Sequence, residues 1–140
     1  MADEKALQLL AEDEEDLKVI SAALQDAVAR IGDIQYEAAG RRLTVGLNRF
    51  RWEAGKRERV RAGLQLGSVL SVQARRLRRG TPDAVVELLA VKFEPGEAPG
   101  GAVTLTFAGG GDLRCEVECV DAVLADVSQP WPTKRAPVHG

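Results

Sequence analysis

Three successive strand patterns between residues 84 and 120 constrain the fold more than any other part of the chain. From Val103 to Phe107 apolar residues alternate with threonines, and from Leu113 to Cys119 they alternate with charged residues. A period of two is typical of a strand with one buried and one exposed face. The glycines at 109–111 predict a turn between these strands, because glycine accepts positive φ without steric cost. The preceding segment, Val85–Phe93, is apolar on both faces and predicts a central strand covered on each side.

An amphipathic helix is predicted over residues 13–28. Its apolar residues recur at spacings of three and four and so gather on one stripe. They are Leu17, Ile20, Leu24, Ala27, Val28 and Ile31. Asp13 can cap the first turn, where the acidic residues 14–16 also interact favourably with the helix dipole. This acidic cluster therefore indicates a helix start rather than a metal site. A short edge strand is expected before it, within residues 5–11.

Four further strands are predicted between the helix and the meander. They are Ile34–Tyr36, Leu43–Trp52, Arg57–Leu66 and Val69–Leu77. In the second of these the apolar residues change face, which predicts a bulge between Gly46 and Asn48. After the meander, apolar residues at spacings of three and four predict a short closing helix within residues 120–127.

These elements predict an α+β fold. Its centre is a strongly bent antiparallel sheet or open barrel of about seven or eight strands, with an N-terminal helix and a short C-terminal helix attached. A PH-like barrel is the alternative. Residues 1–127 are expected to form a single domain, because a chain of 140 residues can bury one proper core. Residues 128–140 contain three prolines and no periodicity, which predicts an irregular tail.

Composition points to a soluble protein. The chain is 45% hydrophobic and 29% charged, as is usual for globular domains. No apolar run approaches the roughly 20 residues that a membrane helix needs, so no membrane association is expected. The first residues are acidic, whereas a secretory signal opens with positive charge and a long apolar core. We therefore expect a cytoplasmic location.

The residues that usually carry catalysis or bind metals are scarce. Cys115 and Cys119 lie four positions apart on one predicted strand, about 13 Å, which is too far for a disulfide or a shared zinc ion. The single histidine, His139, lies beside the C-terminus, where an imidazole is rarely held in place. The glycines at 109–111 lie between two strands and match no phosphate-binding loop. Glu116 and Glu118 share an exposed face, which strand alternation explains without acid–base chemistry. We expect no catalytic residues, no metal and no cofactor.

Charge is distributed unevenly along the chain. Residues 41–79 carry twelve basic side chains and two acidic ones. Residues 1–40 carry ten acidic against three basic side chains, and residues 80–140 carry nine against four. A formal net charge of −2 therefore conceals a basic middle between two acidic ends.

The basic middle contains a predicted hairpin with two possible registers. One register places Phe50 opposite Val60, so that both enter the core. The other, with a shorter connection at Ala54–Gly55, places Arg51 opposite Glu58. Burying an apolar side chain is worth about 1.5–3 kcal/mol, whereas like charges opposed on a sheet cost at most about 1 kcal/mol. We therefore predict the first register.

The first register predicts a ladder of outward arginines. It sets Arg51 against Arg59 and Arg49 against Arg61, and Arg75 and Arg76 extend the same basic face. Crowded guanidinium groups need a counter-charge, which a partner molecule could supply. The predicted partner-binding residues are Arg49, Arg51, Arg57, Arg59, Arg61, Arg75 and Arg76.

Several functions are compatible with this face. We expect a small non-catalytic binding or assembly module whose partner is an acidic protein surface or a second copy of the chain. A protein that binds the nucleic-acid backbone is the alternative, because arginine suits phosphate, although such domains usually have a basic pI. Neutralisation within the chain, by the acidic N-terminal helix, is the non-functional alternative. An enzyme built from carboxylates and arginines is the least favoured.

Four sequence segments together resemble one known family. They are DEEDLKVISAALQDAVARIGDI, LNRFRWE, LLAVKFEPGE and GAVTLTFAGGGDLRCEVECVDAVLADV. They span nearly the whole chain and resemble the domain of unknown function 2948 family of small bacterial proteins. The resemblance implies a bacterial, single-domain, cytoplasmic protein. It implies no activity and no catalytic residues, because the family has none established.

Overall fold

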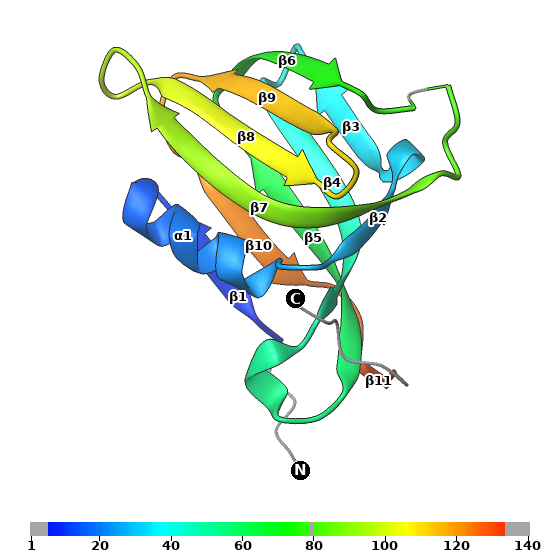
Figure 1. The fold of residues 1–140 in the computed structure, drawn as a ribbon. Coiled ribbons are helices and arrows are strands. Elements are labelled where there is room, and N and C mark those ends of the chain that lie inside the picture. Colours follow the sequence, from blue (N-terminus) through cyan, green and yellow to red (C-terminus); the bar gives the residue numbers. More distant parts are fainter. Residues whose placement is uncertain (1–5, 79, 134–140) are drawn as a thin grey trace.

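Eleven strands form one strongly bent sheet, with a single α-helix beside it, in the described residues 6–78 and 80–133 of this computed structural model (Figure 1). The strands are β1 Gln8–Ala11, β2 Val28–Arg30, β3 Ile34–Glu37, β4 Arg42–Phe50, β5 Glu58–Leu66, β6 Val69–Arg75, β7 Val85–Pro95, β8 Gly101–Phe107, β9 Asp112–Val117, β10 Ala122–Asp126 and β11 Trp131–Pro132. The helix is α1 Glu14–Ala23, and two short 3-10 turns are η1 Ile31–Asp33 and η2 Trp52–Ala54. The fold is thus largely β, with more strands than the seven or eight predicted.

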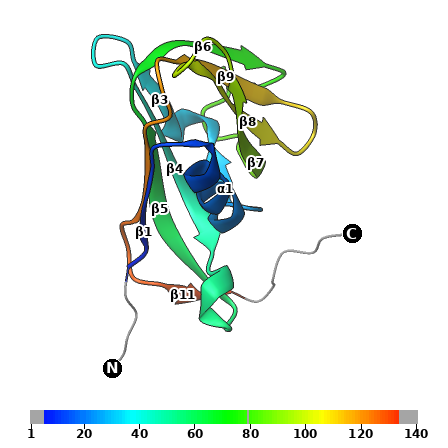
Figure 2. The ribbon, with the colours of Figure 1, turned by 90° about the vertical axis from the view of Figure 1, so that its left-hand side faces the viewer.

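The strands pair in the order β1-β10-β5-β4-β2-β7-β8-β9-β6, all antiparallel. In addition β3 pairs with β4, and β11 pairs with β5. The sheet bends so that β7, β8, β9 and β6 form a layer over β4, β5 and β10 (Figures 1 and 2). It does not close into a barrel, because β6 pairs only with β9 and β3 pairs only with β4 among the described strands. One cluster of buried apolar residues fills the space between the layers.

The predicted meander is confirmed. Strands β7, β8 and β9 are consecutive neighbours, and Leu105 lies opposite both Val91 and Leu113. Gly109 and Gly110 in the β8–β9 turn have φ values of 91° and 97°, as the glycine run predicted. Although β7 lies centrally in the sheet, its outer face is not covered along its length, because Leu89 is 43% exposed. The expectation that both faces of this strand are buried is therefore wrong.

Helix α1 begins as predicted but ends early. Asp13 caps it, since its Oδ1 accepts a hydrogen bond of 2.8 Å from the Asp16 backbone N–H. The helix packs on β7 and β1. The predicted end at Val28 is wrong, because Asp26 adopts a φ of 65° and Val28 already pairs with both β4 and β7. The tertiary pairing of β2 therefore shortens the helix.

The predicted C-terminal helix is a strand. Residues 122–126 form β10, which pairs with β1 on one side and β5 on the other. Ala122 and Leu124 are buried, as expected for alternation in a strand. The spacing of the apolar residues also fits one helical turn, but backbone hydrogen bonds to two neighbouring strands favour the extended form. The tail likewise contributes Trp131–Pro132 to the sheet as β11, and residues 134–140 lie outside the described part.

In the described residues, no helix has both the length and the apolar character needed to cross a membrane.

Candidate binding surfaces

The β4–β5 hairpin adopts the register that the sequence disfavoured. Arg49 lies opposite Val60 and Phe50 lies opposite Arg59, so the predicted pairing of Phe50 with Val60 is wrong. The Arg51 backbone N–H also donates to the Glu58 carbonyl at 2.9 Å. Pairing between the strands is continuous from Leu43 to Phe50, so the predicted bulge is wrong as well. Regular alternation along β4 instead turns Arg49 toward the core.

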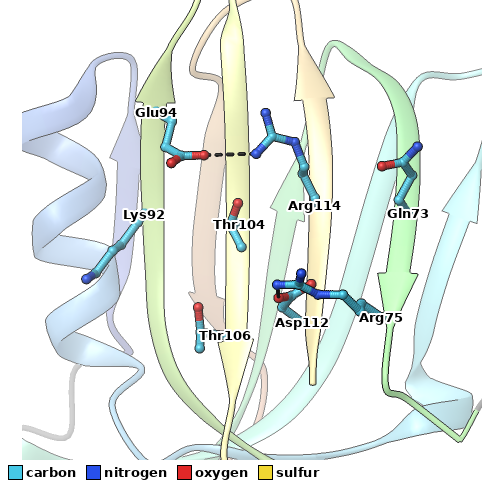
Figure 3. A pocket seen from close by; sticks show the side chains of 8 residues that line it. All are labelled: Gln73, Arg75, Lys92, Glu94, Thr104, Thr106, Asp112 and Arg114. Carbon is cyan, nitrogen blue, oxygen red and sulfur yellow. Dashed lines mark hydrogen bonds and ion pairs between the residues drawn. The ribbon is translucent and has the colours of Figure 1, made fainter. Parts of the chain in front are cut away.

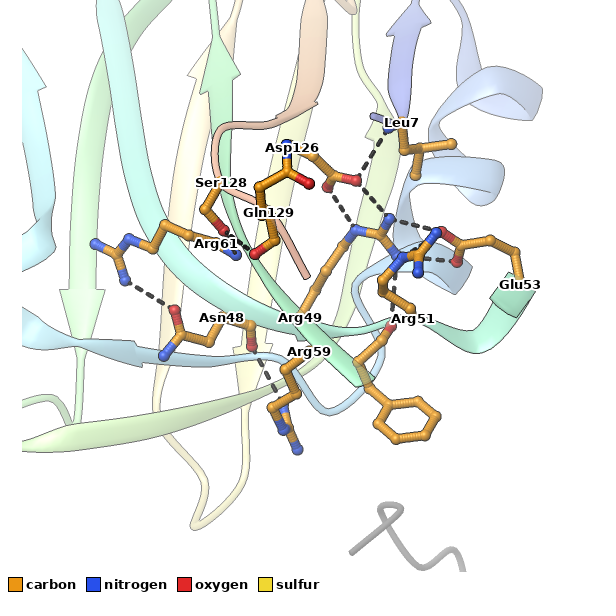
Figure 4. Close-up of polar contacts among 11 residues, drawn as sticks. Leu7, Asn48, Arg49, Arg51, Glu53, Arg59, Arg61, Asp126, Ser128 and Gln129 are labelled. Carbon is orange, nitrogen blue, oxygen red and sulfur yellow. Dashed lines mark hydrogen bonds and ion pairs between the residues drawn. The ribbon is translucent and has the colours of Figure 1, made fainter. Parts of the chain in front are cut away.

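Arg49 is fully buried, with 0% of its side chain exposed, and two carboxylates surround it (Figure 4). Its Nε and Nη2 both donate to Asp126 at 2.8 Å. Its Nη1 and Nη2 donate to Glu53 at 3.0 and 2.7 Å. Burial by itself lowers the pKa of Arg49, but the hydrogen bonds to Asp126 and Glu53 outweigh it and hold the pKa above its ordinary value.

The same cluster connects distant parts of the chain. Asp126, at the end of β10, also accepts a 3.0 Å hydrogen bond from the Leu7 backbone N–H just before β1. Arg51 is 8% exposed and forms an ion pair with Glu58. The hydrogen bond from Arg49 holds the pKa of Glu53 below its ordinary value. The charge of Arg49 and Arg51 is therefore balanced inside the protein, by carboxylates of η2, β5 and β10 rather than by the N-terminal helix.

The remaining hairpin arginines lie on the outward side of β5. Arg61 donates to Asp33 at 3.0 Å, and its other Nη donates to Asn48 at 3.3 Å. Arg59 lies over the Phe50 ring, 5.9 Å from its centroid, and opposite Trp131 of β11. Arg57 is exposed just before β5. The predicted ladder of opposed arginines is wrong, since the structure divides these residues between the two faces of the hairpin.

A second polar surface lies on the outer face of the β7-β8-β9-β6 layer (Figure 3). It forms a hollow of about 440 Å³. Its lining residues are Gln73, Arg75, Lys92, Glu94, Thr104, Thr106, Asp112 and Arg114. They come from the outward positions of four paired strands, because side chains in a strand alternate between faces. In register, Thr104 lies opposite Arg114 and Thr106 lies opposite Asp112. We call this surface the polar hollow.

The charges in the polar hollow are loosely paired. Arg75 contacts Asp112 at 2.6 Å, and Arg114 contacts Glu94 at 2.9 Å. Hydrogen bonds to Glu116 and Glu94 raise the pKa of Arg114. Lys92 forms no ion pair with any described residue and lies at the β7 rim of the hollow (Figure 3). Exposed ion pairs of this kind contribute at most about 1 kcal/mol, so a ligand can replace them.

Sequence reasoning identified only one residue of the polar hollow. Arg75 was in the predicted set, but its neighbour Arg76 does not line the hollow. The others were missed because β6 pairs with β9 and not with β7, the next strand along the chain, so these side chains share one face only in the folded sheet. The available signal was the polar half of the meander's alternation, at Thr104, Thr106 and Arg114, which we assigned to solvent alone.

Two features of the described residues bear on metal binding and thiol reactivity. No set of three His, Cys, Asp or Glu side chains in residues 6–78 and 80–133 is placed to hold a metal ion. Burial raises the pKa of Cys115 to about 12, which keeps this thiol protonated at neutral pH. The single histidine, His139, lies outside the described residues.

A family model described as "Protein of unknown function (DUF2948)" matches residues 7–139. The match includes the hairpin and every strand that contributes to the polar hollow. No curated protein and no solved structure matches the chain.

Proposed function

Because the chain belongs to the DUF2948 family, whose description names no activity, we propose from its surfaces that it is a non-catalytic module that binds an acidic segment of a partner protein in the polar hollow. The observation that carries this proposal is that Arg75, Arg114 and Lys92 all line one hollow on the outer face of the sheet. Among the described lining residues, two carboxylates, Glu94 and Asp112, lie beside these three cations, and Glu116 also pairs with Arg114 at 2.9 Å.

The chemistry of the polar hollow favours carboxylate ligands. The side chains of Arg75 and Arg114 are 75% and 45% exposed, so a partner's carboxylates can reach them. The planar fork of arginine matches a carboxylate with two parallel hydrogen bonds. The hydroxyls of Thr104 and Thr106 lie between the charged groups and can bond the backbone of an extended segment (Figure 3).

A second copy of the chain is one partner with this chemistry. The first turn of α1 carries Glu14, Glu15 and Asp16. Glu14 and Glu15 are exposed. An acidic helix end of this kind could enter the polar hollow of a neighbouring molecule. Self-association and binding of a different acidic protein are separated by measuring the oligomeric state.

The direct test is fluorescence anisotropy with a labelled peptide of alternating glutamate and glycine at low salt. We expect saturable binding that weakens as salt rises, because exposed charges are screened. The double variant Arg75→Gln/Arg114→Gln should raise the dissociation constant about tenfold or more. The matched control is Arg41→Gln/Arg42→Gln, which removes two exposed arginines from ion pairs with Glu118 and Glu37 elsewhere on the surface.

Two results would count against the proposal. One is the absence of peptide binding at low salt, and the other is equal loss of affinity in the control and the hollow variant. Light scattering coupled to size exclusion gives the oligomeric state of the same samples. A dimer that dissociates in Arg75→Gln/Arg114→Gln, but not in the control, identifies the partner as a second copy.

The outward side of β5 supports a second candidate, binding of single-stranded nucleic acid. Arg59 lies between Phe50 and Trp131 in register, and Arg57 and Arg61 flank it along the strand. An exposed aromatic ring beside cations is typical of surfaces that bind single strands, and here that ring is Trp131, since Phe50 is buried. Anisotropy with generic single-stranded DNA and RNA at low salt tests this candidate. Binding that Arg59→Gln reduces and Arg75→Gln/Arg114→Gln does not would assign it to the hairpin, and no binding would remove it.

A further inference from the structure

An apolar cavity of about 240 Å³ lies where the bent sheet fails to close, between β3 and β6. Its walls include Ile31 of η1, Ile34 of β3, and Val72 and Ala74 of β6. Leu43 and Leu113, from the core on either side, also line it and are 1% and 4% exposed. The cavity therefore reaches from the seam between the two strands to the hydrophobic core.

Among the described residues, hydrogen bonds join the seam at one end. There the Tyr36 hydroxyl donates to the Val69 carbonyl at 3.0 Å, and the Val69 backbone N–H donates to the Arg41 carbonyl at 2.9 Å. Beyond Val69, β6 pairs only with β9 among the described strands, and its edge toward β3 has no strand partner. The small side chain of Ala74 lies in this unjoined part and leaves the space unfilled.

Among the described residues that line the cavity, Tyr36 alone has a polar side chain, and its hydroxyl already donates to the Val69 carbonyl. The other polar atoms of the wall belong to the main chain. Water in an apolar space needs two to four polar partners to be held there, and an empty space forfeits dispersion contacts along its whole lining. The apolar side chains of the wall therefore favour an occupant that is apolar.

We propose that this cavity binds a compact, uncharged hydrocarbon group of about two fused rings. An apolar cavity of about 150 Å³ holds one benzene molecule, so a cavity of about 240 Å³ suits a somewhat larger group. A charged group is excluded, because burying it without a partner is strongly unfavourable. This site is separate from the polar hollow: Val72 and Ala74 line the cavity, while Gln73 and Arg75 line the hollow from the opposite face of β6.

The test uses naphthalene as the probe and 2-naphthoate as its charged analogue, followed by methyl chemical shifts in the full-length protein. We expect saturable shifts at Ile34, Val72 and Leu113 with naphthalene and none at these residues with 2-naphthoate. Ala74→Leu fills the cavity and should weaken naphthalene binding about tenfold or more. Ala90→Leu is the matched control, because Ala90 lies opposite Thr106, which lines the polar hollow.

The second filling variant, Ile34→Phe, keeps the test decisive if Ala74→Leu does not fold. Loss of binding in either folded variant, with binding retained in Ala90→Leu, supports the proposal. The proposal is overturned if naphthalene at its solubility limit shifts none of the cavity methyls, if the shifts map to another surface, or if the folded filling variants bind as the unmodified protein does. None of these outcomes depends on binding at the polar hollow.

Discussion

At the scale of single residues, the decisive feature is an arginine in a position that strand alternation assigns to the core. Leu43, Val45, Leu47 and Arg49 occupy the same face of β4, and all are buried. Burying an unpaired charge is prohibitive. Arg49 is tolerated because Asp126 and Glu53 each accept two of its hydrogen bonds. The buried Arg49 of β4 is therefore linked by hydrogen bonds to η2 and β10 instead of facing a partner.

Removing this arginine should destabilise the protein severely. Arg49→Met leaves Asp126, whose side chain is 2% exposed, without its main counter-charge. We expect a loss of about 3–5 kcal/mol in the free energy of unfolding, the usual cost of breaking a buried pair. Urea unfolding followed by circular dichroism measures it.

The double variant Arg49→Met/Asp126→Leu is the control for this interpretation. Replacing a buried ion pair by apolar residues of similar size is often nearly neutral, so at least about half of the lost stability should return. A double variant that is less stable than Arg49→Met would show that packing, and not the unpaired carboxylate, accounts for the loss.

Glu53 should make stability depend on acid pH. Its pKa lies below the ordinary value of 4.5, chiefly because Arg49 donates hydrogen bonds to its charged form. The folded state therefore holds this proton less tightly than the unfolded chain does. The stabilisation is complete above the unfolded value and is lost as pH falls through the lowered folded pKa. Its size is limited, because the Glu53 side chain is 44% exposed and solvent screens it.

The measurement compares unfolding free energies of the unmodified protein and Glu53→Gln between roughly pH 7 and pH 3. The variant should be less stable near neutrality, and the difference should shrink below pH 4.5. A difference that stays constant across this range would mean that the charge of Glu53 does not contribute.

At the scale of elements, pairing with strands distant in sequence determines whether a short segment forms a helix or a strand. Residues 122–126 could form a helical turn, yet they lie between β1 and β5 as β10. The strands of the meander do not depend on such pairing for their identity, because the alternation of their residues and the glycine turn specify strands locally.

At the first turn of the meander, Gly101 begins β8 directly opposite Pro95 of β7.

Gly101 should tolerate no side chain. A Cβ built there would lie 2.3 Å from the Glu94 carbonyl oxygen and 2.7 Å from the Phe93 ring. Because the nearest atom belongs to the backbone, the strands must separate, and Gly101→Ala should cost about 1–3 kcal/mol. Thermal and urea unfolding measure the change.

Gly63→Ala is the matched control, since Gly63 also lies within a strand and a Cβ there meets nothing within 4 Å. We expect it to be neutral or to stabilise by up to about 1 kcal/mol, through a less flexible unfolded chain. Equal destabilisation by both variants would contradict the steric explanation.

At the scale of the whole molecule, the bent sheet has two consequences for binding. Its outer face carries the polar hollow, and its unclosed seam carries the apolar cavity. Strand β6 contributes to both, with alternate residues on opposite faces. How firmly β6 is held to β3 therefore affects the shape of both sites.

Tyr36→Phe tests the closure of the seam. The variant removes the hydroxyl that donates to the Val69 carbonyl, so we expect a loss of about 0.5–1.5 kcal/mol in the free energy of unfolding. Amide hydrogen exchange should accelerate in β6 and remain unchanged in β8, which lies away from the seam. Equal acceleration of amide exchange in β6 and β8 would mean that the Tyr36 hydrogen bond stabilises the whole protein and not the seam in particular.

Much of the fold could be predicted from the sequence, and much less of the binding surfaces. The meander, the Asp13 cap, the edge strand at residues 8–11 and most strands of the bent sheet follow from local patterns. Of the residues that line the polar hollow, Arg75 alone was identified. The hollow depends on which strands become neighbours, and alternation within one strand carries no information about that.

The sequence by itself determined the features that depend on neighbouring residues. These are the positions of most strands, the start of α1 and the turn where glycine reverses the chain. Tertiary structure alone decided the hairpin register, the burial of Arg49 and the extended form of residues 122–126. The physical reason is that each of these depends on a partner distant in sequence. Asp126 lies 77 positions from Arg49 and compensates its buried charge, which reverses the register that apolar burial within the hairpin favoured.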